Sequence, residues 1–314
     1  MNVIVEREKG LVELEQRIAD LKKISAEQKA DLSTEITALE QKYAEIQREV
    51  FGSLTPWQRV SMARHPKRPL GSDYIAALDQ FDELHGDRHF RDDPAIVGGF
   101  AKLRGRRVIA IAQDKGHDTK EKVRSNFGMA MPEGYRKVKR LVALAGHLHL
   151  PVITFVDTSG ADPGIGSEER AQAEAIASVL YELAAVPTPV VATIIGEGGS
   201  GGALALALAD RVMMLEHAVY SVASPEGAAT ILWSDATKAE EAAARLRLTS
   251  DDLLGFGIVD QVIPEPLGGA HRDASGTMNR VFDAIDAALS ALGEQPIDAL
   301  LERRYAKFRR IGVT

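Results

Sequence analysis

The chain has 314 residues, of which 45% are hydrophobic and 26% charged, with a formal net charge of −7. This length supports one large or two modest domains with a sizeable core, and the composition is that of an ordinary globular protein. The acidic balance gives no general basic footprint for nucleic acid. Because the sequence contains no cysteine, it excludes disulfides, zinc–thiolate sites and a cysteine nucleophile.

The first residues, MNVIVEREKG, are charged and lack the long apolar segment of a signal peptide. No apolar run approaches the roughly 20 residues that a membrane-spanning helix needs. The absence of cysteine fits a reducing compartment. The sequence therefore predicts a soluble, cytoplasmic protein with no membrane contact.

Two helices are predicted in the N-terminal stretch. Apolar residues recur at helical spacing over residues 11–24 and again over residues 32–50, where the steps are 4, 3, 4, 3 and 4. The polar stretch 25–31 separates the two helices. Their apolar seam must be covered, either by the body of this chain or by another subunit. Both alternatives make this part of the chain a helical appendage rather than a catalytic module.

The segment His65-Pro66-Lys67-Arg68-Pro69 is predicted to be a connector, because two prolines within five residues end a helix. Its basic side chains are interpreted as solvated, with contact to phosphate as the alternative. The sequence thus divides into residues 1–69, a helical extension with its connector, and residues 70–314.

Residues 70–314 have the pattern of an α/β domain. Short apolar runs predict strands at Val108–Ala112, Val152–Val156, Val190–Ile195, Val212–Leu215 and Val219–Val222. Helical periodicity predicts helices at Tyr135–Leu150, Glu168–Ala185, Gly202–Asp210, Met278–Leu292 and Ile297–Arg310. Continuous apolar strands that alternate with helices indicate buried, largely parallel strands.

The densest chemical signal is Gly196-Glu197-Gly198-Gly199-Ser200-Gly201-Gly202, in which five of seven residues are glycine. A predicted strand precedes this glycine-rich turn, and a helix of small residues follows it. Glycine allows a ligand to approach the backbone closely, and the start of a helix presents unpaired N–H groups that favour negative charge. We therefore predict a main-chain donor site for an anion or an oxyanion.

Three other interpretations of this turn remain open. Residues 196–201 match the dinucleotide pattern G-x-G-x-x-G, with Glu216 twenty residues after the first glycine, although the following helix is short. The overlapping pattern G-x-S-x-G makes Ser200 a candidate hydrolase nucleophile, with Asp235 and His271 in the order of an acid and a base. The third interpretation is a tight turn that only permits close helix packing.

A second glycine-rich loop, residues 157–166, follows the predicted strand Val152–Val156, and Ser167 is placed to cap the next helix. The two loops follow successive strands, at the sheet edge where α/β proteins bind ligands. A plain surface turn is the alternative. The loop residues expected at the substrate site are Thr158, Ser159, Gly160, Ala161, Asp162, Pro163 and Gly164.

Several segments together carry a family resemblance. They are Phe81–Arg88, Lys120–Lys122 with Asn126–Met129, Pro132–Lys137, Gly196–Ala205, Ser224–Ala228 with Ile231–Trp233, and Ile263–Arg272. With them the chain resembles the alpha subunit of bacterial acetyl-CoA carboxylase carboxyltransferase. The match extends from the N-terminal helices to residues 303–305 and covers nearly the whole chain.

The resemblance implies a crotonase-like (ClpP/crotonase) spiral of ββα units, preceded by the helical extension and ending in C-terminal helices. It implies transfer of a carboxyl group from carboxybiotin on a biotin carboxyl carrier protein to acetyl-CoA, which forms malonyl-CoA for fatty acid biosynthesis. It also implies an α2β2 heterotetramer with a zinc-containing beta subunit, without which the chain is inactive. Neither covalently held biotin nor a metal is expected in this subunit.

Within this resemblance, the main-chain amides of Gly201, Gly202 and Ala203 are expected to stabilise negative charge on the biotin ureido oxygen. Loss of one such donor typically lowers a rate by ~10²–10³-fold. The substitution Gly202→Val is predicted to block its amide without unfolding the chain. The other residues of the turn expected in the substrate site are Gly198, Gly199 and Ser200.

The second loop departs from the family pattern, which usually has proline where Ser159 stands and tyrosine where Asp162 stands. Loss of the proline loosens the turn, and a carboxylate in place of an aromatic ring changes the packing and charge beside the site. A divergent relative that carboxylates another acyl-CoA is therefore an alternative, as is a scaffold that has kept the fold and lost activity.

Overall fold

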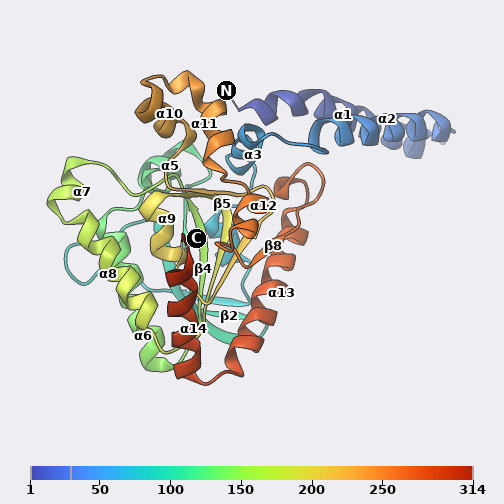
Figure 1. The fold of residues 1–314 in the computed structure, drawn as a ribbon. Coiled ribbons are helices and arrows are strands. Elements are labelled where there is room, and N and C mark those ends of the chain that lie inside the picture. Colours follow the sequence, from blue (N-terminus) through green and yellow to red (C-terminus); the bar gives the residue numbers. More distant parts are fainter. Residues whose placement is uncertain (1, 29, 313–314) are drawn as a thin grey trace.

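A mixed eight-stranded sheet with helices on both faces forms the body of the protein in a computed structural model that describes residues 2–28 and 30–312 (Figure 1). A helical arm extends from this body at the N-terminal end of the chain. None of the helices within the described ranges is both long and apolar enough to cross a membrane.

The sheet consists of β1 (Gln80–Glu83), β2 (Ile96–Leu103), β3 (Arg106–Gln113), β4 (Val152–Thr158), β5 (Val190–Gly199), β6 (Arg211–Leu215), β7 (Val219–Ser221) and β8 (Gln261–Ile263). Its order is β1-β2-β3-β4-β5-β6-β8, and β7 pairs with the end of β5. The first three strands are antiparallel, and every pairing from β3 onward is parallel. The structure therefore contains all five predicted strands and places them in the predicted parallel part.

The helices of the body are α4 (Gly71–Ala76), α5 (Thr119–Arg124), α6 (Pro132–Leu148), α7 (Ile165–Glu169), α8 (Gln172–Ala185), α9 (Ser200–Ala207), α10 (Pro225–Trp233), α11 (Ala239–Leu246), α12 (Ser250–Gly255), α13 (Ala274–Gly293) and α14 (Ile297–Arg310). Strand β4 separates two layers of them. Its Thr154 hydroxyl donates to a carbonyl of α9, whereas Phe155 packs on Tyr74 of α4 and Phe282 of α13. The single helix predicted over 168–185 is divided in two, because Ala171 adopts a left-handed φ of 65°.

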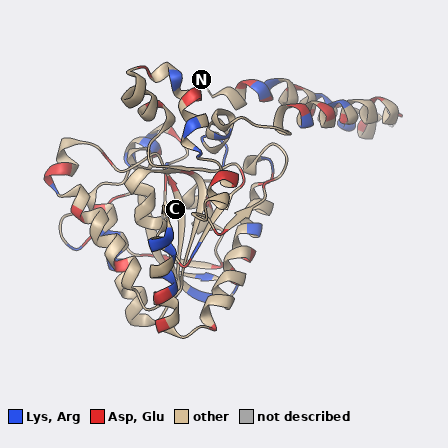
Figure 2. Ribbon diagram, viewed as in Figure 1, with Lys and Arg blue, Asp and Glu red and all other residues tan. Residues whose placement is uncertain are grey.

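The arm is a hairpin of α1 (Val3–Gln28) and α2 (Ser33–Phe51), followed by α3 (Pro56–Ala63). Charges of both signs are interspersed along it (Figure 2). Ile4 and Leu11 of α1, Phe51 of α2 and Met62 of α3 form one buried cluster, with Tyr43 packed against it. The body thus covers the seam at the base of the arm, as in the first of the two alternatives. Farther out, most seam residues are half-buried and Ile24 is 38% exposed, so the second alternative stays open there.

The connector after α3 differs from the solvated segment that was expected. His65 and Arg68 are both buried. Arg68 donates through Nε to the carbonyl of Ile195 at 2.7 Å and pairs with Glu265, and neither side chain of that pair is more than 1% exposed. The expectation failed for Arg68 because its carboxylate and carbonyl partners lie more than a hundred residues away, and for His65 because its partner Glu8 lies 57 residues away. The local sequence does not reveal such partners.

Candidate active site

The glycine-rich turn joins the end of β5 to the start of α9. Ser200 has a φ of 53°, so the chain reverses in a left-handed conformation at a residue other than glycine. No side chain caps the helix. By helix geometry the amides of Gly201 and Gly202 have no intrahelical acceptor, whereas the Ala203 amide closes the first turn on the Gly199 carbonyl. Two of the three expected donors therefore lack an intrahelical acceptor, and of these Gly201 is half-buried whereas Gly202 is buried.

The second loop lies directly against this turn. A Cβ atom added to Gly199 would be 2.1 Å from the Ser159 oxygen, and one added to Gly202 would be 2.5 Å from the Ala161 nitrogen. The expectation that Gly202→Val leaves the fold intact is therefore wrong, because the side chain would collide with backbone. Gly201 has only Ile176 near it, at 3.9 Å, so that position has room for a side chain.

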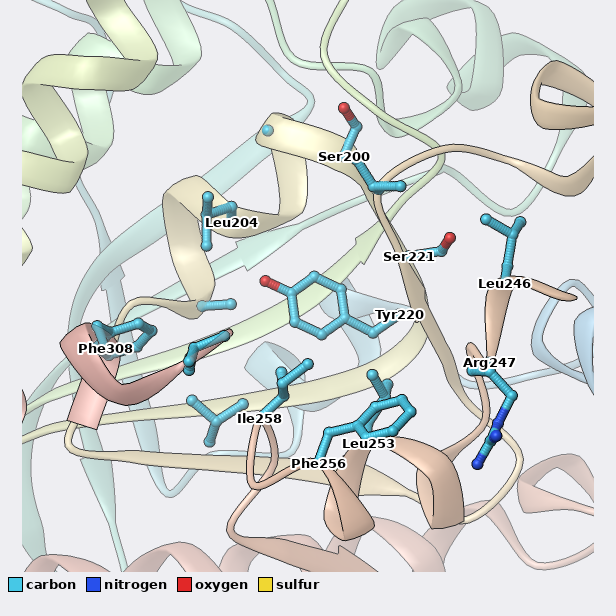
Figure 3. A pocket seen from close by; sticks show the side chains of 15 residues that line it. Ser200, Leu204, Tyr220, Ser221, Leu246, Arg247, Leu253, Phe256, Ile258 and Phe308 are labelled. Atoms are coloured by element: carbon cyan, nitrogen blue, oxygen red, sulfur yellow. The ribbon is translucent and has the colours of Figure 1, made fainter. Parts of the chain in front are cut away.

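A mainly apolar cavity of about 400 Å³ opens beside the turn, which is a size typical of small-molecule sites (Figure 3). Ser200, Gly201 and Leu204 border it from α9, and Tyr220 and Phe256 face them. Burial raises the pKa of Tyr220 to about 12, so its hydroxyl stays neutral at physiological pH. A backbone donor thus stands at the edge of an apolar cavity, and Gly198 and Gly199 are buried behind it.

The remaining predicted residues hold the second loop together and do not line the cavity. Thr158 is buried, and its hydroxyl oxygen accepts the amide hydrogen of Gly160 at 3.1 Å. Asp162 accepts hydrogen bonds from Asn126 at 2.9 Å and from the Ser167 hydroxyl at 2.5 Å. The loop's outer surface is formed by Ser159 and Pro163, which are exposed, with half-buried Gly160, Ala161 and Gly164 between them.

Two buried polar side chains that the sequence analysis missed support the turn from below. The Gln113 amide donates to the Gly202 carbonyl at 2.8 Å and accepts from the Asp157 nitrogen at 3.1 Å. Asp157 in turn accepts the amide hydrogen of Glu197 at 2.8 Å. Gln113 ends β3 and Asp157 lies in β4, so adjacent strands fix the backbone before and after Ser200. Their positions at strand ends are the only sequence signal that could have indicated this role.

Positive and negative side chains pair with one another around Glu197. Lys115 contacts Asp157 at 2.7 Å and Glu197 at 3.4 Å, and Arg64 donates through Nε to Glu197 at 3.0 Å. Burial opposes ionisation of Glu197, but the charges of Lys115 and Arg64 outweigh it and hold its pKa below the ordinary value. Likewise, burial opposes the charge of Lys115, yet Asp157 and Glu197 raise its pKa. The turn therefore rests on ionised, mutually paired groups.

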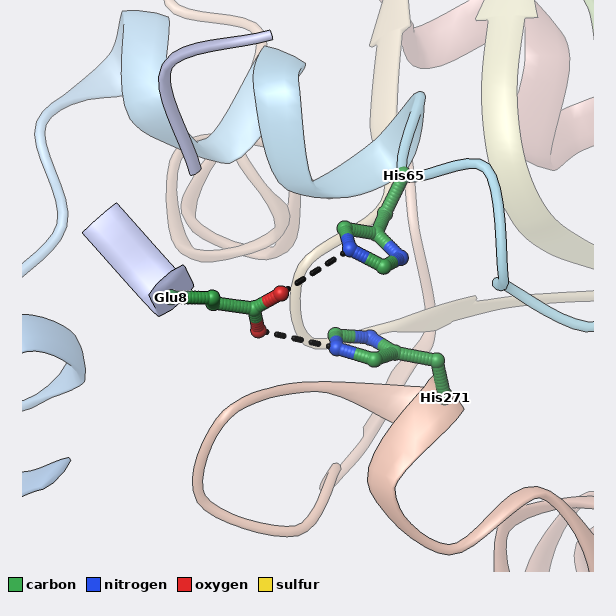
Figure 4. Close-up of side chains that lie close together, drawn as sticks. All are labelled: Glu8, His65 and His271. Atoms are coloured by element: carbon green, nitrogen blue, oxygen red, sulfur yellow. Dashed lines mark hydrogen bonds and ion pairs between the residues drawn. The ribbon is translucent and has the colours of Figure 1, made fainter. Parts of the chain in front are cut away.

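Glu8, His65 and His271 form a second buried cluster, at the base of the arm (Figure 4). The Nε2 atoms of His65 and His271 lie 3.0 and 2.9 Å from the two Glu8 carboxylate oxygens. The two rings stack with centroids 3.7 Å apart and planes at 16°. Nearly parallel rings aim their nitrogens side by side, whereas a tetrahedral ion needs ligand directions that converge. The geometry is that of a hydrogen-bonded clamp between arm and body.

Comparison with known proteins identifies the family. A family profile described as acetyl co-enzyme A carboxylase carboxyltransferase-like matches residues 4–312. The acetyl-coenzyme A carboxylase carboxyl transferase subunit alpha of Erythrobacter litoralis is 50% identical over 313 residues, which are 99% of this chain and 100% of that protein. The chain belongs to the acetyl-CoA carboxylase carboxyltransferase alpha family.

Solved structures of a transcarboxylase and a malonate decarboxylase confirm the fold that the resemblance implied. Transcarboxylase 12S superposes with a TM-score of 0.59 at 21% identity, over 73% of this chain and 43% of that one. The Pseudomonas malonate decarboxylase hetero-tetramer superposes with a TM-score of 0.57 at 19% identity, over 69% of this chain and 90% of the matched one. The sheet and helices of this alpha-family chain thus share the fold of these two proteins.

Two alternative interpretations of the turn lose their supporting residues in the structure. Ser200 has the backbone conformation of a nucleophile elbow, but His271 is bonded to Glu8, and Asp235 accepts hydrogen bonds from Thr237. The acidic residue of the dinucleotide pattern, Glu216, accepts the amide hydrogen of Glu265. Each candidate partner is therefore committed to contacts elsewhere in the alpha-family fold.

Proposed function

We propose that the chain is the alpha half of an acetyl-CoA carboxylase carboxyltransferase. It transfers a carboxyl group from carboxybiotin, held on a biotin carboxyl carrier protein, to acetyl-CoA and so forms malonyl-CoA. The observation that carries the proposal is the free amide of Gly201 at the edge of the apolar cavity. Main-chain donors of this kind stabilise an oxyanion without a reactive side chain.

The chemistry needs a donor to a developing oxyanion and a largely apolar site. Cleavage of the N–carboxyl bond leaves negative charge on the ureido oxygen of biotin, and the carboxyl carbon bonds to the methyl carbon of acetyl-CoA. The displaced methyl proton passes to the freed biotin nitrogen, so atoms balance without a side-chain base. Gly201 and Gly202 would donate to the ureido oxygen, while the side chains opposite, Tyr220 and Phe256, would cover the apolar part of the ring system.

Exposed apolar side chains near the cavity support the proposed partner, a zinc-containing beta subunit in an α2β2 assembly. Val222 and Phe256 both border the cavity, and they are 78% and 54% exposed. Ile231 and Leu232 of α10 are also largely exposed. Clustered exposed apolar residues mark surfaces that another protein covers. The beta subunit would close the cavity there and supply the donors for the thioester oxygen, in the cytoplasm where malonyl-CoA is formed.

The test is reconstitution. The chain is co-expressed with the beta subunit encoded in the same genome, and carboxyl transfer is measured with carboxylated carrier protein and with acetyl-CoA or propionyl-CoA as acceptor. We expect a stable complex with malonyl-CoA as the main product, and no activity from either subunit alone. Faster carboxylation of propionyl-CoA would instead favour the divergent acceptor that Ser159 and Asp162 suggest. A stable complex with no transfer to either acceptor would contradict the proposal.

A further inference from the structure

The segment 64–68, which we call the bracket, contacts the last residues of β5 at two points. Arg64 holds the carboxylate of Glu197 through Nε and Nη2, at 3.0 and 2.5 Å. Arg68 holds the carbonyl of Ile195 at 2.7 Å. Ile195 and Glu197 flank Gly196, the first residue of the glycine-rich turn. The bracket therefore holds β5 at residues that lie four and six positions before Gly201.

Both arginines are anchored on their far side as well. Arg64 also contacts Glu226 at the start of α10, at 2.6 Å. Arg68 forms a two-point pair with Glu265 at 2.6 and 2.9 Å. Burial opposes the charge of Arg64, but the carboxylates of Glu197 and Glu226 raise its pKa above the ordinary value. Planar guanidinium groups with two partners fix direction as well as charge.

The contact of Arg64 with Glu197 bears on the direction of the backbone donors. Glu197 is fixed on one side by Arg64 and on the other by Asp157, which accepts its amide hydrogen. Three residues further on, Ser200 makes the left-handed reversal that aims the following amides. These contacts restrain Glu197 in addition to the pairing of the end of β5 with β4 and β7. The direction of the Gly201 amide is therefore set partly by a side chain outside the cavity.

We propose that Arg64 is a positioning residue for carboxyl transfer, which acts through Glu197 on the amides of Gly201 and Gly202. Its effect on the reaction rests on the proposed function, whereas its effect on the turn does not. Oxyanion donors accelerate a reaction only when they are already oriented toward the developing charge, and small displacements lower the rate steeply.

The experiment compares Arg64, the residue that follows α3, with Arg59 within α3. Arg64→Met removes the grip on Glu197. Arg59→Met is the matched control, because Arg59 donates to the Glu216 carbonyl at 2.9 Å and pairs with Asp251, but does not touch the turn. With the reconstituted complex, we expect Arg64→Met to lower kcat by about 10- to 100-fold while KM for acetyl-CoA changes by less than about twofold. Arg59→Met should leave both constants unchanged.

A double variant tests whether Arg64 acts through Glu197. If it does, Arg64→Met combined with Glu197→Gln lowers kcat by clearly less than the product of the two single losses, because both changes break the Arg64–Glu197 pair. Losses that multiply would overturn the proposed route. Equal kcat losses in Arg64→Met and Arg59→Met would overturn it as well, since the effect would then be general destabilisation.

Hydrogen exchange of the full chain keeps this inference separate from the proposed function. Arg64→Met should speed amide exchange in residues 197–203, and Arg59→Met should not. Unchanged exchange in both variants contradicts the positioning role, whatever the activity of the complex. Faster exchange in Arg64→Met together with an inactive wild-type complex would support the role of Arg64 in positioning the turn. The same outcome would count against carboxyl transfer as the function.

Discussion

Gly201 and Gly202 are adjacent at the start of α9, but only Gly201 has room for a side chain. We therefore predict that Gly201→Val keeps the fold and lowers carboxyl transfer by about 100-fold, because a branched side chain on the same residue crowds a ligand oxygen that approaches its amide. Gly202→Ala should instead lower the thermal midpoint, since its Cβ would press on the second loop. Transfer assays and thermal unfolding of both variants check this. Full activity in Gly201→Val would exclude its amide as a donor.

Asp162 shows how one residue can differ from its family pattern and still hold a loop. Its carboxylate binds Asn126 and Ser167, so hydrogen bonds hold the loop at the position where the family pattern is expected to have an aromatic ring. Asp162→Ala is expected to lower the free energy of unfolding by about 1–2 kcal/mol, measured in urea. Asp235→Ala, which removes an exposed acid bonded only to Thr237, should lower it by less. An equal loss in both would assign Asp162 no special role.

At the scale of elements, the arm is tied to the body by the Glu8 clamp. Glu8→Ala leaves the buried Nε2 atoms of His65 and His271 without their hydrogen-bond acceptor. An unsatisfied buried polar group lowers the free energy of unfolding by about 1–3 kcal/mol. We predict faster hydrogen exchange in the first half of α1 and in residues 64–68. Glu13→Ala, at an exposed position of the same helix, is the control and should change neither. Unchanged exchange in Glu8→Ala would mean that apolar packing alone docks the arm.

The clamp also predicts a pH dependence of arm docking. Burial lowers the pKa of His271 despite its bond to Glu8. Burial opposes ionisation of Glu8, but hydrogen bonds from His271 and His65 lower its pKa from 4.5 to about 2. The other charged group facing them is Arg272, 3.5 Å from Glu8 and paired with Glu15.

Both shifts weaken docking as pH falls. Once the arm is released, His271 takes up a proton below about 6.5 and Glu8 below about 4.5, whereas in the docked state both resist protonation to lower pH. Because the chain lacks cysteine, Gln16→Cys at an exposed arm position can carry a single dye. Dye anisotropy should fall between pH 7 and pH 5. A flat profile, or the same profile in His271→Asn, would contradict the prediction.

At the scale of the whole molecule, the apolar surface beside the cavity should be an interface. Val222→Asp places a charge in it without disturbing the core, because this side chain is 78% exposed. We predict a normal thermal midpoint for the free chain and at least tenfold weaker binding of the beta subunit, measured by titration. Val12→Asp on the arm is the control for an added surface charge. Equal binding by both variants would place the interface elsewhere.

Periodicity determined much of the architecture. The strands Val152–Thr158 and Val190–Gly199 are buried at every residue, so each begins in the sequence with a mainly apolar run, VITFV and VVATII. The strands that escaped prediction lack that signal: β1 is polar and exposed, β2 is interrupted by two glycines, and β8 has three residues. Short or polar strands are fixed by their neighbours and not by their own composition.

The sequence by itself determined the family, the parallel part of the sheet and the glycine-rich turn, because buried strands and flexible turns impose local constraints that a short segment expresses. Only the tertiary structure decided which glycine has room, which amides stay free and which side chains hold the turn. Arg64, Gln113, Asp157 and Glu197 are far apart along the chain. The hydrogen bonds and ion pairs of these side chains stabilise the turn because they lie in a buried interior with little water. Which charged groups meet there depends on how distant strands and the connector pack.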